Sequence, residues 1–147
     1  MIALGCDHGG FLLKEAIKKY LEAGKIEYKD FGSFDEKSID YAPIAAKVAH
    51  SVMNGEAEKG ILCCGTGIGM SIAANKVQGI RASVCDNEFC TEMTRRHNNS
   101  NILCLGGRVI NEEKAVALAK LYLETPYEGG RHQNRLDEIA AIERGEL

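Results

Sequence analysis

Short apolar runs alternate along this chain with longer segments in which apolar residues recur at helical spacing. The runs consist almost entirely of apolar and β-branched residues with no polar face, a pattern typical of buried strands in a parallel sheet. They span residues 2–6, 26–31, 60–64, 80–85 and 102–105.

The segments between these runs are predicted to be helices, at residues 11–23, 42–53, 69–76, 87–96 and 111–123. In the first of them Leu13 and Ile17 fall on one face, so Lys14 and Lys18 are expected to face water. The alternation of strands and helices predicts a three-layer α/β/α, Rossmann-like domain with a five-stranded parallel sheet.

The pattern changes after Pro126, where a loop precedes a final helix with an apolar stripe that includes Leu136, Ile139 and Ile142. This additional C-terminal helix either covers its own domain or packs against a second subunit, and the pattern leaves both open. No internal repeat or linker interrupts the chain, so residues 1–147 are predicted to form a single domain.

Composition narrows the classes of function. With 45% apolar residues, 27% charged residues and a net charge of -3, the chain resembles an ordinary globular domain with no general attraction for nucleic acid or an anionic membrane. It has no signal-peptide pattern and no apolar stretch near the roughly 20 residues of a membrane span, so a cytoplasmic location is expected. The six cysteines are then expected to be reduced, and no C-x-x-C pair points to a structural metal site.

In open α/β sheets ligands bind beyond the carboxyl ends of the strands, so the residues that follow the apolar runs are the candidates for chemistry. Asp7 and His8 follow the first run and precede two glycines and a predicted helix. A helix start of this kind favours phosphate or a developing oxyanion. The alternative is that Asp7 only caps the helix and that His8 is exposed.

The loop after the third run reads C-G-T-G-I-G over residues 64–69. Its alternating glycines allow close backbone approach and convergent N–H groups, while the missing phosphate-loop lysine disfavours a nucleotide site. Cys64, facing these donors, suits removal of a proton next to a carbonyl, with the N–H groups holding an enediolate oxygen. Packing is the alternative, and because strand side chains alternate, only one of Cys63 and Cys64 can serve the site.

Further polar residues lie near the predicted ends of other elements. His97 and Asn98 end the fourth helix and suit a general acid and a hydroxyl ligand, or a histidine favoured only by the helix dipole. Arg131 and Arg135 are four residues apart, so with Arg108 they suit a phosphate fork. The alternative for the arginines is a solvated charged face.

Four motifs together resemble one family, the type B ribose-5-phosphate isomerases with the related allose- and galactose-6-phosphate isomerases. They are D-H-G-G, C-G-T-G-I-G-M-S-I-A-A-N-K, R-R-H-N-N and Y-E-G-G-R-H-Q-N-R, in this order over essentially the whole chain. The resemblance implies a metal-independent aldose–ketose isomerase of the pentose phosphate pathway that needs no cofactor.

The resemblance also implies a role for each residue of the motifs. Cys64 is the base that moves the proton between C1 and C2, and Thr66 relays a proton between O1 and O2. Asp7 and His97 open the furanose ring, with His97 as the proton donor. The enediolate is held by the backbone of the loop glycines Gly65, Gly67 and Gly69. Some relatives instead place a glutamate base where this chain has Met70, which assigns the chain to the cysteine-base group.

Substrate binding follows from the same resemblance. Asn98 contacts the sugar, and Tyr41 lines its pocket even though Ala42 stands where the family often has proline. The phosphate is held by His8, Arg108, Arg131 and Arg135. Members of the family are homodimers or dimers of dimers with shared active sites, so residues 126–147 are expected to pack against a second subunit.

Other functions remain to be weighed against the ribose 5-phosphate and ribulose 5-phosphate pair. A hexose-6-phosphate isomerase for allose or galactose phosphates needs a pocket about one carbon longer, which the sequence does not resolve. A non-catalytic sugar-phosphate-binding module does not require Cys64, Thr66 and His97 together. A cysteine phosphatase or thiol redox protein needs a different loop or a resolving cysteine, and the chain has neither.

Overall fold

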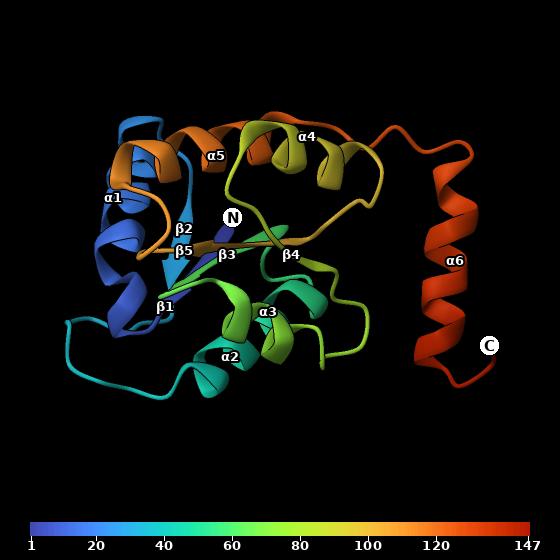
Figure 1. The fold of residues 1–147 in the computed structure, drawn as a ribbon, viewed down its shortest axis with the longest axis horizontal. Helices are drawn as coiled ribbons and strands as arrows, with labels where there is room; N and C mark the ends of the chain where they lie inside the picture. Colours follow the sequence, from blue (N-terminus) through green and yellow to red (C-terminus); the bar gives the residue numbers. More distant parts are fainter.

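A five-stranded, all-parallel sheet forms the centre of the computed structural model, which describes residues 1–147 (Figure 1). The strand order is β2-β1-β3-β5-β4. The strands are β1 (Ile2–Cys6), β2 (Tyr28–Asp30), β3 (Lys59–Cys64), β4 (Ala82–Val84) and β5 (Ile102–Gly106). The predicted parallel α/β fold is therefore confirmed.

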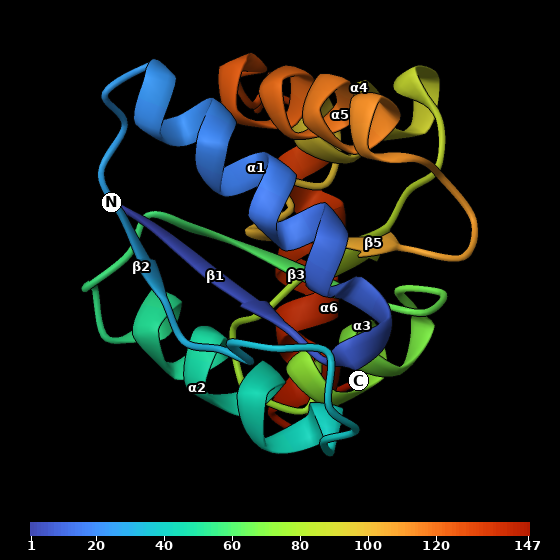
Figure 2. The ribbon, with the colours of Figure 1, turned by 90° about the vertical axis from the view of Figure 1, so that its left-hand side faces the viewer.

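Helices cover both faces of this sheet. One layer consists of α1, α4 and α5, and the other of α2 and α3, as the two views in Figures 1 and 2 show. The helices are α1 (Phe11–Ala23), α2 (Tyr41–Met53), α3 (Ile68–Ala74), α4 (Glu88–Arg96), α5 (Glu112–Glu124) and α6 (His132–Glu143), with a short 3-10 turn at His8–Gly10.

Two hydrophobic clusters fill the spaces between the sheet and the helix layers. Ile17 of α1 and Leu118 of α5 pack in one cluster, and Val48 of α2 packs in the other. Every residue of the central strands β1 and β5 is buried, whereas the edge strands β2 and β4 are half-exposed. The prediction of strands without a polar face was therefore wrong for the two edges, where solvent replaces a neighbouring strand.

The chain passes from β1 to β2 on one side and then crosses to β3 on the other side of β1, so the switch point of the sheet lies between β1 and β3. The loops that follow β1, β3 and β5 meet there. The Asp7 N–H donates to the Cys63 carbonyl at 3.1 Å, and the Gly107 N–H donates to the Cys64 carbonyl at 2.8 Å. These bonds bring three chemically rich loops to one edge.

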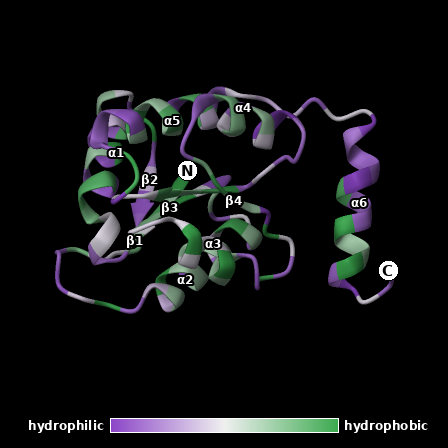
Figure 3. Ribbon diagram, in the orientation of Figure 1, coloured by the Kyte–Doolittle hydropathy of each residue, from purple (hydrophilic) through white to green (hydrophobic).

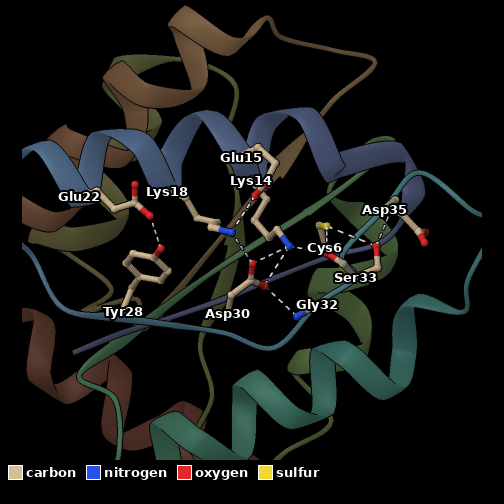
Figure 4. A network of polar contacts seen from close by, with 10 residues as sticks. All are labelled: Cys6, Lys14, Glu15, Lys18, Glu22, Tyr28, Asp30, Gly32, Ser33 and Asp35. Atoms are coloured by element: carbon tan, nitrogen blue, oxygen red, sulfur yellow. Dashed lines mark hydrogen bonds and ion pairs between the residues drawn. The ribbon is translucent and has the colours of Figure 1, made fainter.

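Lys14 is an exception to the helical pattern of α1. It was predicted to face water, but it is only 1% exposed. Its ammonium lies 2.9 Å from both carboxylate oxygens of Asp30 and also donates to the Ser33 carbonyl (Figure 4). A buried cation is tolerated only when it is paired, and β2 supplies the partner. The segment after β2 is thereby tied to α1.

The last helix, α6, stands at the end of the molecule opposite the start of α1 (Figure 1). Its apolar residues alternate with polar ones around the helix (Figure 3). Leu136 is buried, but Ile139 and Ile142 are 44% and 60% exposed. Only part of the predicted apolar stripe therefore packs on its own chain. None of the helices has the length and hydropathy needed to span a lipid bilayer.

Candidate active site

Cys64 ends β3 at the switch point and is 5% exposed. The Gly67 N–H donates to its sulfur at 3.1 Å. Gly67 has a φ of 83° and precedes α3, and a side chain there would press on the backbone of Leu105. The turn that directs an N–H group at the thiol therefore requires glycine. A charged thiolate gains most from such a donor.

Two further N–H groups of the same loop, those of Gly65 and Thr66, have no acceptor within the chain. They are free to bind a substrate oxygen. The Thr66 hydroxyl accepts the Ile68 N–H at 3.2 Å, which holds the side chain on the loop. Arg108 follows β5, donates its N–H to the Gly65 carbonyl at 2.9 Å, and lays its guanidinium beside Gly65.

Asp7 and His8 lie beside this loop, because the backbones of Gly9 and Gly65 are in close contact. One oxygen of the buried Asp7 carboxylate accepts the Gly9 N–H at 2.8 Å, so Asp7 does cap the turn. The Nδ1 of His8 accepts the Ile39 N–H at 3.2 Å. This bond leaves the proton of a neutral imidazole on Nε2, where it can be donated to a phosphate oxygen.

Tyr41 is the first residue of α2, and its ring lies against Gly69. A Cβ at Gly69 would come within 2.7 Å of the ring carbon Cζ. Pro43 falls in the first turn of α2, where a missing N–H costs nothing, so Ala42 does not displace the tyrosine. Tyr41 therefore borders the thiol loop.

His97 and Asn98 do not reach this edge of the sheet. His97 caps the end of α4, and Asn98 accepts a bond from Arg81 just before β4. Both therefore lie near the amino ends of the strands, and the five residues of β5 separate the two edges by about 13 Å. Within one chain the predicted acid is remote from the predicted base.

The two C-terminal arginines belong to the same remote group. Arg131 directly precedes α6, and the Arg135 guanidinium donates to its carbonyl at 3.0 Å. The segment between α5 and α6 is held to α4 because the Glu128 N–H donates to the Arg96 carbonyl at 3.0 Å. The predicted site residues thus form two groups, one at each edge of the sheet.

Two residues of the remote group carried no predicted role. His132 is buried, and its ring stacks on that of His97 with centroids 4.2 Å apart. The Glu128 carboxylate lies 3.9 Å from His97 Nε2 and 3.6 Å from His132 Nε2. The spacing of four between Glu128 and His132 is the only signal in the sequence, and it does not indicate the contact with His97.

The largest cavity, of about 620 Å³, meets the thiol site only at its rim, through His8, Gly9 and Gly107. Its carboxylates Glu112 and Glu113 disfavour an anion. A smaller cavity of about 270 Å³ adjoins Thr66 and Gly106. The candidate site is therefore the exposed face of the loop that follows Cys64, and not the largest cavity.

A parallel α/β sheet with a thiol, a buried carboxylate and free backbone donors at its switch point defines the class, an enzyme fold acting on a small polar substrate. The family is clear from comparison with known proteins. A model described as Ribose/Galactose Isomerase matches residues 2–139. The chain belongs to this family.

Individual relatives agree over the full length. Ribose-5-phosphate isomerase B of Escherichia coli is 46% identical over 97% of this chain and 96% of its own. The ribose-5-phosphate isomerase B of Clostridium thermocellum superposes with a TM-score of 0.97 at 44% identity, covering 99% of each chain. That of Mycoplasma genitalium, solved with bound ribulose-5-phosphate, gives a TM-score of 0.92 at 36% identity, covering 97% of this chain and 95% of its own.

Proposed function

We propose that this protein interconverts ribose 5-phosphate and ribulose 5-phosphate through a cis-enediolate, with Cys64 as the base. The observation that carries the proposal is the Cys64 sulfur, which receives the Gly67 N–H at 3.1 Å beside the free N–H groups of Gly65 and Thr66. A base next to unpaired donors matches the needs of proton transfer at a carbon adjacent to a carbonyl.

The reaction begins with ring opening. Asp7 takes the proton of the anomeric hydroxyl while the imidazole of His97 protonates the ring oxygen, which frees the aldehyde. The Cys64 thiolate then removes the C2 proton and returns it to C1. Thr66 moves a proton between O2 and O1, and the N–H groups of Gly65 and Thr66 hold the enediolate oxygens.

One role differs from the expectation for the loop glycines. The Gly67 N–H is engaged by the Cys64 sulfur, so it stabilises the thiolate and not the enediolate. The N–H of Gly69 lies in the first turn of α3 and completes the set of donors. The chemistry needs no Lewis acid, because backbone donors neutralise the developing charge.

The phosphate is bound by His8 and Arg108 from one subunit and by Arg131 and Arg135 from its partner. His97 and Asn98 also come from the partner, because both lie at the edge of the sheet opposite Cys64. A homodimer or dimer of dimers with shared sites follows. Exposed apolar side chains support it, namely Ile68 and Ile72 on α3 and Ile139 and Ile142 on α6.

Relatives favour the pentose over the hexose. The Escherichia coli relative is named for ribose 5-phosphate, and the Mycoplasma genitalium relative was solved with ribulose-5-phosphate. Allose 6-phosphate or galactose 6-phosphate is the alternative substrate within the same chemistry.

The test measures isomerisation of ribose 5-phosphate and allose 6-phosphate with EDTA present, for the wild type and Cys64→Ala. Loss of a general base lowers turnover by about 100-fold or more. Cys90→Ala is the matched control, because Cys90 is an exposed thiol on α4 and its loss should leave turnover unchanged. Near-normal activity of Cys64→Ala would show that another group is the base.

A further inference from the structure

At the remote edge of the sheet, His97 lies beside two residues, Glu128 and His132, to which the isomerase reaction assigns no role. His97 ends α4, Glu128 lies in the connection between α5 and α6, and His132 begins α6. One donor atom from each residue lies within 4.8 Å of the other two. Potential ligands from two separate parts of the sequence, His97 and the Glu128–His132 pair, therefore converge on one point.

Within this triplet of residues, the environment of His132 points most directly to a bound ligand. It is 8% exposed, and its Nε2 is buried without any hydrogen-bond partner. A buried nitrogen left unpaired costs free energy, so native structures normally satisfy it. The Glu128 carboxylate comes within 3.6 Å of this nitrogen, too far for a hydrogen bond. An atom placed between the two would satisfy both.

We propose that His97, Glu128 and His132 bind one divalent transition-metal ion, with zinc as the representative metal, and that the bound ion inhibits the isomerase. Two imidazoles and a carboxylate are ligands that zinc, nickel and copper accept, whereas magnesium and calcium prefer oxygen alone. Three protein ligands leave a fourth position for water.

The distances need only a small adjustment. Ligand atoms around a tetrahedral zinc lie about 3.3 Å apart. Here His97 Nε2 lies 3.9 Å from one Glu128 oxygen and His132 Nε2 lies 3.6 Å from the other, and one ligand atom from each residue lies within 4.8 Å of the other two. The stacked rings, only 16° from parallel, must tilt so that both nitrogens face the ion. His97 can make this turn, because it lies at the end of a helix with 39% of its side chain exposed.

The inhibition rests on the proposed function. The nitrogen that would bind the metal is His97 Nε2, and a coordinated nitrogen has no proton to give and no lone pair to receive one. The ion also ties the His97 ring to Glu128 and His132 of its own chain, and so withdraws the ring-opening acid from the neighbouring subunit's site. Substrate and metal compete for the same imidazole.

The first experiment titrates zinc into the EDTA-treated and dialysed full-length protein by calorimetry. The wild type and Cys64→Ala should each bind one ion per chain. Replacing a ligand, as in His132→Asn or Glu128→Gln, should weaken binding by about 100-fold or more. His50→Asn, which changes a histidine on α2, should leave binding unchanged. Wild-type affinity in both ligand variants would overturn the site.

The second experiment measures isomerisation with and without zinc, each variant against its own metal-free rate. Zinc should inhibit the wild type, EDTA should reverse the inhibition, and His132→Asn should be resistant. Equal inhibition of His132→Asn would mean that zinc acts elsewhere, for example at the Cys64 thiolate. Zinc binding to the wild type without inhibition would mean that the bound ion leaves His97 functional. Either result overturns the proposal that the bound ion inhibits the isomerase. A chain that binds zinc but isomerises no sugar phosphate refutes the proposed function and leaves the metal site standing.

Discussion

At the scale of single residues, two adjacent thiols show how strand geometry separates structure from chemistry. Cys63 packs in the cluster beneath α1 and α5, whereas Cys64 packs toward α2 and α3 and receives the Gly67 N–H. Burial raises the pKa of the Cys63 thiol well above its usual value, and it does the same for Cys104 on β5. Both therefore stay protonated in the folded protein.

Protonated thiols are poor nucleophiles, so alkylation should discriminate among the cysteines. At pH 8 iodoacetamide should modify the exposed Cys90 first, and it should leave Cys63 and Cys104 unmodified until the protein unfolds. Because burial raises the pKa of both thiols, a higher pH should not make them reactive toward iodoacetamide before unfolding begins. Peptide mass spectrometry reads each site. Native labelling of Cys63 at the rate of Cys90 would contradict this assignment.

At the scale of elements, the buried Lys14 joins α1 to β2 and organises the segment that leads to the site. Asp30 accepts from Lys14 and from the Gly32 N–H, and Ser33 accepts from Lys14 (Figure 4). The same segment continues to residue 39, whose N–H fixes the tautomer of His8. The Lys14–Asp30 ion pair therefore helps to position His8, a proposed phosphate ligand.

Replacement of Lys14 by methionine should lower the free energy of unfolding by about 3 kcal/mol, because the Asp30 carboxylate stays buried with only Lys18 as a cationic partner. The double variant with Asp30→Asn should lose less, since no buried carboxylate remains unpaired. Lys19→Met, an exposed lysine on the same helix, should change stability by less than about 0.5 kcal/mol. Urea unfolding measures all three, and equal effects of Lys14→Met and Lys19→Met would refute the ion pair's importance.

At the scale of the whole molecule, the two groups of site residues lie at opposite edges of the sheet, so no single chain can assemble the proposed site. The exposed isoleucines of α3 and α6 offer surfaces for the second subunit that the proposed function requires. A shared site makes a prediction about mixed subunits.

Cys64→Ala and His97→Asn should each be weakly active alone. When the two are unfolded and refolded together, half of the dimers are mixed, and each mixed dimer has one intact site. About a quarter of wild-type activity should then return. Mixing Cys64→Ala with wild type under the same conditions controls for refolding losses. No gain above the separate variants would contradict a site that takes Cys64 from one chain and His97 from its partner.

The sequence by itself determined the elements and the local loops. The first helix was predicted at the bounds of α1, and the first strand at those of β1, because apolar spacing reflects which face each element buries. The thiol loop followed from its glycines, since a left-handed residue such as Gly67 is a local requirement. The family resemblance, based on motifs along the chain, was confirmed.

Only the tertiary structure decided what depends on distant partners. Lys14 was expected in water, because helical period cannot show that a carboxylate 16 residues further on will pair with it. The stack of His97 on His132 arises from the path of the connection between α5 and α6, which no local pattern encodes. Separation of His97 from Cys64 likewise follows from the direction of α4 across the sheet. Local propensity fixes elements, whereas burial, pairing and shared sites are properties of contacts between elements.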